Sequence, residues 1–346
     1  MPEASKTTSD RGPTIHTVAA AAGVAASTVS RALSNPGRVN AVTRKRIEDI
    51  AAELGYSRPA RQQPPMSGPL KTVAVFVADI TNPFYFDVIR GTQQQLKAAG
   101  YAQLLVDTEE SGELEGDMVT RLRGSFDGAI LAASRLSDKE LGTLSQSIPL
   151  VVINRNVKGV PGIVIDTPTG VVQALEHLVS LGHRDIVYVA GPARSWANEM
   201  RWRALRQAAG KHGLEARRIG PFPPDRTAGS AAADAVLNSG ATACVAYNDL
   251  VAIGMLRRFK ERGIDVPGRI SVVGCDDIFG ADFCHPPLTT LTAPIEQVGR
   301  VAVSMLLGTL EQRPGARRTQ VVLPTHLTVR ESTGPVSGST QSIDPL

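Results

Sequence analysis

Apolar residues recur at helical spacing in three short blocks between residues 14 and 56. Thr14 is placed to cap the first block and Gly23 to end it in a left-handed conformation, while Asn40 caps the third block, which ends at Gly55. A tight turn around Gly23 between two short helices is typical of a helix-turn-helix. The expected small core consists of Ile15, Val18, Ala19, Val24, Val29, Leu33, Val42, Ile47, Ile50 and Leu54.

From Lys71 the pattern changes to short apolar strands that alternate with amphipathic helices. Residues 72–78 form a continuous apolar run, as in a strand buried on both faces, whereas 84–99 have helical spacing. The alternation predicts parallel sheets covered by helices on both faces. It continues in tandem through a second unit that begins near Asp166, so we expect an α/β body with two lobes. Residues 332–346, rich in Ser, Gly, Thr and Pro, are expected to be a flexible tail.

The length of 346 residues predicts two or three compact units, with no apolar run long enough for a transmembrane helix. Residues 1–13 are polar and lack the apolar core of a signal peptide. We therefore expect a disordered arm there and a cytoplasmic protein with no membrane partner. Cys244, Cys275 and Cys284 have no metal-ligand spacing, which favours free thiols; no metal site and no cofactor are expected.

Positive charge is concentrated near the start of the chain. Residues 1–70 hold nine Lys/Arg against five Asp/Glu, an excess equal to the net charge of +4 of the whole chain, so residues 71–346 balance at zero. A basic helical head on a neutral body predicts contacts with the phosphates of DNA. The alternative, an ordinary three-helix cap on a larger domain, leaves this charge distribution unexplained.

The same stretch resembles the DNA-binding head of the LacI/GalR (lactose-repressor) family of bacterial transcriptional regulators. The motif comprises Val18-Ala19, Ala22-Gly23-Val24, Ser27-Thr-Val-Ser-Arg-Ala-Leu33, Thr43-Arg44 and Leu54-Gly55-Tyr56. The resemblance covers about residues 14–331 and implies a body of the type I periplasmic-binding-protein fold with two Rossmann-like lobes. It places lobe one at about 71–166 and 294–320, and lobe two at about 167–293 and 321–331.

The resemblance implies a sequence-specific regulator, in the first instance a repressor, that binds double-stranded DNA as a homodimer. Twofold symmetry makes its operator near-palindromic. A helix-turn-helix of this kind is expected to read base edges with Ala26, Ser27 and Arg31. Contacts with the DNA backbone are expected from Thr14, His16, Thr28, Ser30, Arg38, Asn40 and Thr43.

Residues 57–70 have the composition of a linker. In the family this region folds on the operator into a hinge helix whose leucine enters the minor groove, a device that kinks DNA. Here Pro65 takes the wedge position and Pro64 precedes it, and proline disfavours a helix interior by about 3 kcal/mol. The remaining hinge candidates are Arg58, Arg61 and Met66.

Parallel sheets bind ligands beyond the carboxyl ends of their strands, where this sequence places amide, carboxylate, guanidinium and aromatic groups. Such groups suit a small polyhydroxyl effector, a sugar or sugar derivative. Family resemblance supports several of them: Arg201 matches the effector-binding arginine and Asp276 the first aspartate of Val-Gly-x-Asp-Asp, although Asn154-Arg155 replaces an Asp-Arg pair. The effector-binding candidates are Asp79, Asn82, Phe84, Tyr85, Asn154, Arg155, Trp196, Arg201, Phe222, Asn248 and Asp276. Asp249 and Asp277 are expected to cap helices instead.

Two other functions fit parts of the sequence. A solute-binding component of a transport system would share the body fold, but the basic head and the lack of an export signal disfavour it. An enzyme is disfavoured because the sequence contains no GxxxxGK loop, HExxH pair or GxSxG elbow. The identity of the effector, its sense of action and the operator sequence are not encoded in these motifs.

Overall fold

The computed structural model describes residues 14–34, 39–54, 56, 68–311 and 320–336. It divides into two compact units, Met1–Gly68 and Pro69–Leu346, which we call the head and the body. Among the described residues, no helix is both long enough and apolar enough to span a membrane.

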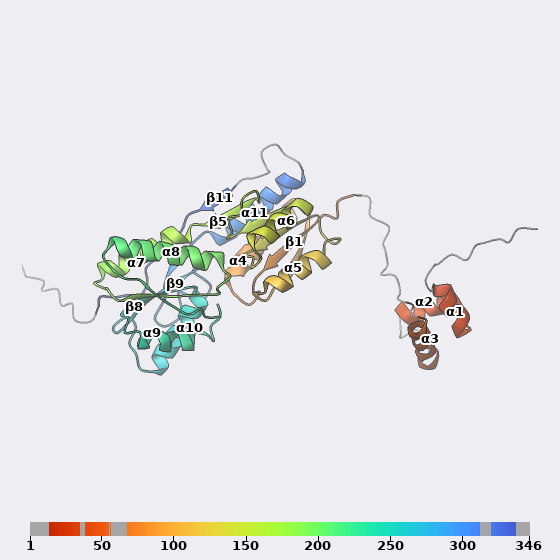
Figure 1. The fold of residues 1–346 in the computed structure, drawn as a ribbon, viewed down its shortest axis with the longest axis horizontal. Coiled ribbons are helices and arrows are strands. Elements are labelled where there is room, and N and C mark those ends of the chain that lie inside the picture. Colours follow the sequence, from red (N-terminus) through yellow and green to blue (C-terminus); the bar gives the residue numbers. More distant parts are fainter. Residues whose placement is uncertain (1–13, 35–38, 55, 57–67, 312–319, 337–346) are drawn as a thin grey trace, which may run out of the picture. The chain divides into compact units, whose positions relative to one another are not determined.

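The described part of the head consists of three helices (Figure 1): α1 (Ile15–Ala22), α2 (Ala26–Ser34) and α3 (Ala41–Glu53). Thr14 caps α1 by accepting a hydrogen bond from the backbone N–H of Thr17, and Asn40 caps α3 by accepting one from Val42 at 2.9 Å. Gly23 ends α1 with a φ of 65°, the left-handed conformation expected from the sequence. These features confirm the predicted helix-turn-helix.

Eight of the ten residues predicted for the core of the head are found there, four of them buried and four partly buried and packed against it. The buried side chains of this core are Val18, Ala19, Ala22, Val29, Ala32, Ile47 and Ala51. The prediction was wrong for Val42, which is 79% exposed, and for Leu54, which is 38% exposed. Val42 lies in the first turn of α3 and Leu54 is its C-cap, so helical spacing at the ends of a helix overstated burial.

Lobe one of the body is a parallel sheet with strand order β11-β5-β4-β3-β1-β2. Its strands are β1 (Thr72–Val77), β2 (Ala102–Asp107), β3 (Gly128–Ala132), β4 (Leu150–Ile153), β5 (Gly162–Ile165) and β11 (Gln320–Leu323). Helices α4 (Phe84–Ala98) and α11 (Ile295–Leu310) cover one face, and α5 (Gly112–Arg121) and α6 (Asp138–Ser147) cover the other. Alternate residues of β1 face the two layers: Val75 packs toward α4 and α11, and Phe76 toward α5 and α6.

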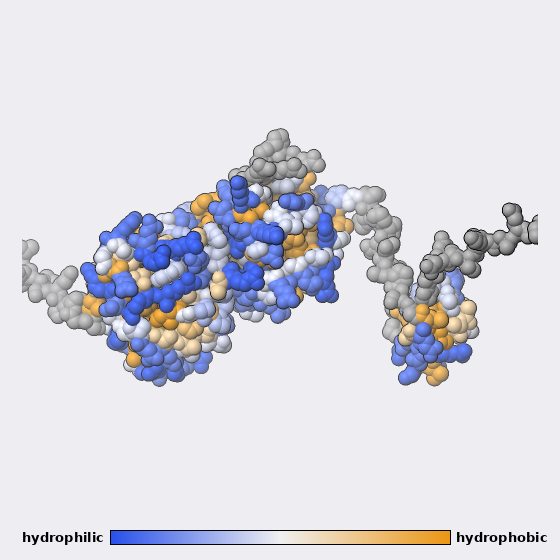
Figure 2. All heavy atoms as spheres, viewed as in Figure 1, coloured by the Kyte–Doolittle hydropathy of each residue, from blue (hydrophilic) through white to orange (hydrophobic). Residues whose placement is uncertain are grey.

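Lobe two repeats this design with strand order β12-β10-β9-β8-β6-β7. Its strands are β6 (Ile186–Val189), β7 (Arg217–Ile219), β8 (Ala243–Ala246), β9 (Ser271–Cys275), β10 (Thr289–Thr292) and β12 (His326–Thr328), of which only β12 pairs in the antiparallel sense. Helices α7 (Thr167–Ser180) and α8 (Trp196–Lys211) cover one face, and α9 (Gly229–Asn238) and α10 (Asp249–Glu261) cover the other. Figure 2 shows that hydrophilic residues dominate the visible surface of the body, as expected when helices enclose apolar strands.

The chain passes between the lobes three times, after β5, after β10 and after β11. The third crossing corrects a predicted boundary. Residues 321–323 were assigned to lobe two, but they belong to β11 and pair with β5 in the sheet of lobe one. Because β11 and β12 are separated by only two residues, the sequence alone did not show that they enter different sheets.

The start of the predicted tail is also part of the fold. Ser332 is fully buried, and its hydroxyl donates to the carbonyl of Val272 at 2.6 Å and accepts from the N–H of Thr289 at 2.8 Å. Gly334 donates to Ser271, which also contacts the buried imidazole of His183. A polar composition suggested flexibility, but these hydrogen bonds fix residues 332–336; residues 337–346 lie outside the described part.

Candidate functional site

A pocket lies between the two lobes at the carboxyl ends of their strands. Lobe one contributes Asn82, Phe84, Tyr85, Glu110, Ala133, Ser134, Arg135, Asn154 and Arg155. Lobe two contributes Ser195, Trp196, Ala197, Arg201, Pro224, Tyr247 and Asp276. Eight of the eleven effector-binding candidates therefore converge on one cavity, although they are spread over nearly 200 residues of sequence.

The backbone at this pocket is in a conformation that side chains rarely adopt. Ala133, Asn154 and Asp276 directly follow β3, β4 and β9 and have φ values of 55°, 56° and 116°. Glu110, shortly after β2, has a φ of 58°. Each such residue costs about 1–3 kcal/mol, and strain of this kind is concentrated at functional sites. Here it occurs where the lining side chains leave the sheets.

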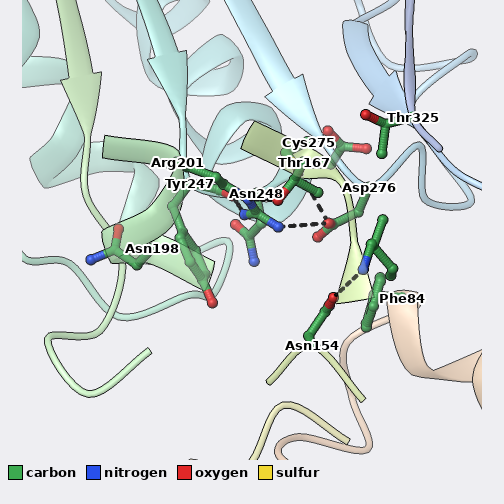
Figure 3. Close-up of polar contacts among 12 residues, drawn as sticks. Phe84, Asn154, Thr167, Asn198, Arg201, Tyr247, Asn248, Cys275, Asp276 and Thr325 are labelled. Atoms are coloured by element: carbon green, nitrogen blue, oxygen red, sulfur yellow. Dashed lines mark hydrogen bonds and ion pairs between the residues drawn. The ribbon is translucent and has the colours of Figure 1, made fainter. Parts of the chain in front are cut away.

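Arg201 is held at the pocket by contacts with several elements of lobe two (Figure 3). It is buried on α8, and its guanidinium donates to the carbonyl of Tyr247 at 2.5 Å and to the hydroxyl of Thr167 at 3.0 Å. The same group lies 5.3 Å from the centre of the Tyr247 ring. Its remaining nitrogen, Nη2, lies 3.7 Å from Asp276. These contacts orient one planar donor toward the pocket.

Asp276 is a carboxylate whose side chain is 11% exposed and whose charged neighbours include Arg201. Burial raises the pKa of Asp276 to about 6, and the nearby charge of Arg201 opposes that rise. Near neutral pH the group is therefore mainly ionised. It faces the pocket as an acceptor, the form suited to a hydroxyl donor of a ligand.

Asn154 and Arg155 form the opposite wall. The amide oxygen of Asn154 accepts from the backbone N–H of Ile165 at 3.2 Å. Nη2 of Arg155 donates to the carbonyl of Leu136 at 2.9 Å and to Asp138 at 2.7 Å. Nε of Arg155 is buried and has no hydrogen-bond partner within the described residues. A buried donor of this kind is costly unless a ligand or water satisfies it.

Sequence reasoning missed the ion pair on the rim of this wall. Nε of Arg135 donates to Glu110 at 2.7 Å, and Nη1 donates to the carbonyl of Ala133 at 2.8 Å. Glu110 lies shortly after β2 and Arg135 shortly after β3. Their positions beyond strand ends could have indicated a place in the pocket.

Tyr247 was also missed, although it follows β8 directly. Its hydroxyl hydrogen-bonds Ser195 at 3.0 Å, joining the strand end to the start of α8. A Cβ added to Gly191 would lie 2.3 Å from the Tyr247 ring, so glycine is required where the loop passes over the ring. Asn198 holds that loop by accepting from the N–H of Gly191 at 3.0 Å.

Three predicted residues do not line the pocket. Asp79 forms a local turn, accepting from both the N–H and the hydroxyl of Thr81. Phe222 packs against the core of lobe two. Asn248 caps α10 through the N–H of Val251 and donates to Pro224.

The two aspartates expected to cap helices do not do so. Asn248, not Asp249, is the N-cap of α10. Asp249 is buried and accepts from Thr290 at 2.6 Å and from the N–H of Ile278. Asp277 binds Arg330 at 2.8 Å and Thr292 at 2.8 Å, so it ties the segments near the lobe crossings together.

The head presents a polar surface on α2. Ser27 and Arg31 are exposed and lie one helical turn apart, whereas Ala26, Thr28 and Ser30 are half-buried. Thr14, His16 and Asn40 are exposed, and Thr43 is half-buried in the first turn of α3. The candidates Arg38, Arg58, Arg61 and Met66 lie outside the described residues.

Comparison with known proteins agrees with both units. Residues 14–59 match bacterial regulatory proteins of the lacI family, and residues 175–333 match the periplasmic binding protein-like domain. The chain is 31% identical over 306 residues to the transcriptional repressor CytR of Escherichia coli (strain K12), covering 86% of this chain and 90% of CytR. Fold and pocket thus define a DNA-binding regulator with an effector-binding body.

Solved structures of transcriptional regulators also match this chain over most of its length. The Lac repressor dimer bound to operator and the anti-inducer ONPF is 26% identical, with a TM-score of 0.69 over 94% of this chain and 100% of that one. The transcriptional regulator CelR in complex with cellobiose is 30% identical, with a TM-score of 0.68 over 92% and 99%. This chain belongs to the LacI family of bacterial regulatory proteins, which are transcriptional regulators and not enzymes. The predicted family and fold class are confirmed.

Proposed function

We propose that this chain acts in the cytoplasm as a homodimer that binds a near-palindromic operator and represses transcription. A small polar effector, a sugar or sugar derivative, binds between the lobes and controls operator affinity. The observation that carries this proposal is the pocket itself, whose polar lining comes from both lobes. A ligand that bridges the two walls favours one arrangement of the lobes over others, which is the basis of allosteric control.

The chemistry of the pocket supports a polyhydroxyl ligand. Asp276 and Asn154 offer acceptor oxygens, Arg201 and Arg155 offer planar donors, and Trp196 adds an aromatic surface at the start of α8. Directional donors and acceptors beside aromatic rings fit the hydroxyls and ring faces of sugars. The CelR structure is a cellobiose complex, which places a sugar on a relative with the same fold.

The head supports sequence-specific binding. Ser27 and Arg31 are exposed on the same face of α2, and Arg31 has the geometry for bidentate hydrogen bonds to guanine. Ala26 offers apolar contact to a thymine methyl. Exposed Thr14, His16 and Asn40 lie at the starts of α1 and α3, where contacts with phosphates would fix the register of the head.

A thermal-shift screen of sugars on the full chain tests the effector proposal, because a ligand that binds only the native state raises the melting temperature. An active compound is then tested in a gel shift with operator DNA selected from random duplex. Asp276→Ala should retain operator binding and lose the response to the compound. An unchanged dose response in this variant would remove Asp276 from the effector site.

A further inference from the structure

The charged groups that line the pocket are unequal in number. Three guanidinium groups, of Arg135, Arg155 and Arg201, face two carboxylates, of Glu110 and Asp276. All three arginines are at least 94% buried, so their charges are poorly screened by solvent. The lining by itself therefore carries an excess of one positive charge.

Two of the three arginines have a carboxylate of the lining as a neighbour. Glu110 is paired with Arg135 at 2.7 Å. Asp276 is the carboxylate nearest to Arg201, at 3.7 Å, and Arg201 is otherwise held by neutral oxygens. The positive charge left without a carboxylate of the lining is therefore that of Arg155.

The carboxylates near Arg155 lie outside the lining. One is the buried Glu115, whose pKa is raised by burial and lowered in part by the charge of Arg155; the other is Asp138. Asp138 accepts from its Nη2 at 2.7 Å, but the side chain of Asp138 is 68% exposed, so water weakens the pair. Nε of Arg155 has no partner within the described residues. The neighbouring side chain is the amide of Asn154, which adds no charge of its own. A buried guanidinium with an unsatisfied N–H is the group that a carboxylate or phosphate oxygen satisfies best.

We propose that the effector of this pocket is an anion, a polyhydroxyl compound carrying a carboxylate or a phosphate, and that its charged group binds at Arg155. The inference rests on the proposed effector function and narrows it from sugars in general to sugar acids or sugar phosphates. Hydroxyls of the same ligand would contact Asp276 and Arg201 on the other wall.

The experiment is calorimetric titration of the full chain with matched neutral and charged compounds. The probes are glucose, gluconate, glucuronate and glucose 6-phosphate, then galactose and galacturonate, then ribose and ribose 5-phosphate, with inorganic phosphate as the charge-only control. We expect at least one acid or phosphate to bind about tenfold or more tightly than its neutral counterpart, as one charge-assisted hydrogen bond supplies. Comparison of the sugar acids with the sugar phosphates shows whether a carboxylate or a phosphate is preferred.

The outcomes separate this inference from the proposed function. A neutral sugar that binds as tightly as its charged counterparts would overturn the inference and leave a sugar effector standing. If no compound of either kind binds, the sugar-type effector fails, and the inference fails with it. Binding of inorganic phosphate alone as tight as that of any sugar derivative would also contradict a polyhydroxyl ligand.

Two variants test whether the charged group of the ligand binds at Arg155. Arg155→Gln should weaken the anionic ligand about tenfold, whereas Arg121→Gln, on a side chain that is 70% exposed, should not. Asn154→Asp tests the same idea without removing a buried group, because an aspartate can still accept from the N–H of Ile165. It should weaken the anion about tenfold, since it adds a like charge beside the ligand. Unchanged anion affinity in Asn154→Asp would overturn the assignment to this wall.

Discussion

The guanidinium of Arg201, whose side chain is 5% exposed, lies 3.7 Å from the carboxylate of Asp276, whose side chain is 11% exposed. Arg201 is on α8, and Asp276 follows β9 directly. The gap is longer than a direct hydrogen bond, so each group keeps capacity for a third partner. Both residues are held in place by elements of lobe two. A ligand hydroxyl can therefore bridge their side chains without a movement of the backbone. This pair is the fixed wall against which lobe one presents Asn154 and Arg155.

Arg31→Ala should weaken binding to the selected operator by about 1–3 kcal/mol while binding to random duplex falls little. The reason is that Arg31 is exposed on α2 and is assigned to base edges. Fluorescence anisotropy on both duplexes measures the difference. Lys45→Ala, on the exposed face of α3, is the control and should weaken both duplexes alike. Equal losses for Arg31→Ala would remove it from the base-reading residues.

Arg135→Met should reduce the free energy of unfolding by about 3 kcal/mol, because it leaves Glu110 without its partner in a mostly buried place. Adding Glu110→Gln should restore part of the loss. Urea denaturation of the single and double variants gives the coupling. Arg121→Met breaks an exposed pair with Asp117 and should change stability by less than about 1 kcal/mol. A single variant as stable as the parent chain would show that the pair is not structural.

Gly91→Ala should destabilise lobe one by about 1–3 kcal/mol. A Cβ at Gly91 would lie 2.1 Å from the backbone carbonyl of Glu296, where α4 crosses α11, so the two helices would have to separate. Gly142→Ala is the matched control, since its Cβ meets no described heavy atom within 4 Å and α6 gains helix propensity. In chemical denaturation, Gly91→Ala should lower the free energy of unfolding and Gly142→Ala should raise it. Equal changes in the two variants would contradict the close crossing of α4 and α11.

Asp249→Asn should flatten the dependence of stability on pH. Burial, followed by the charge of Asp276, raises the pKa of Asp249 to about 7. The folded state thus holds a proton that the unfolded chain releases near pH 4, and this stabilisation is full below about pH 4 and is lost as pH rises through about 7. The gain in melting temperature over the parent chain should be larger at pH 8 than at pH 5. Calorimetry at pH 5 and pH 8 measures this difference, with Asn in place of the exposed Asp282 (Asp282→Asn) as the control. If the melting temperatures of Asp249→Asn and the parent chain change in parallel with pH, the expected effect is contradicted.

The sequence predicted the architecture because its signals are local. Caps at Thr14 and Asn40 and the turn at Gly23 specify the head, and apolar runs such as β3 specify the sheets. The polar composition of Thr289–Thr292 gives no signal for strand β10. Thr289 and Thr290 are buried, and partners far along the chain, Thr333 and Asp249, satisfy their hydroxyls.

The site was predictable in part for the same reason. Arg201 and Asp276 belong to motifs that the resemblance identifies, and the fold places them together. Arg135 and Glu110 have no such motif, and their pairing across 25 residues depends on β2 and β3 ending at the same edge of the sheet. Phe222 and Asn248 are near strand ends as well, but their side chains are used by packing and capping.

Control of the head through the pocket is tested most directly by the affinity of the full chain for its selected operator, measured by fluorescence anisotropy with and without the ligand found by titration. Saturating ligand should shift operator affinity by about fivefold or more, and operator DNA should shift ligand affinity by the same factor. Asp276→Asn should bind operator and lose the shift. An operator affinity that is the same with and without saturating ligand would contradict control of the head through this pocket.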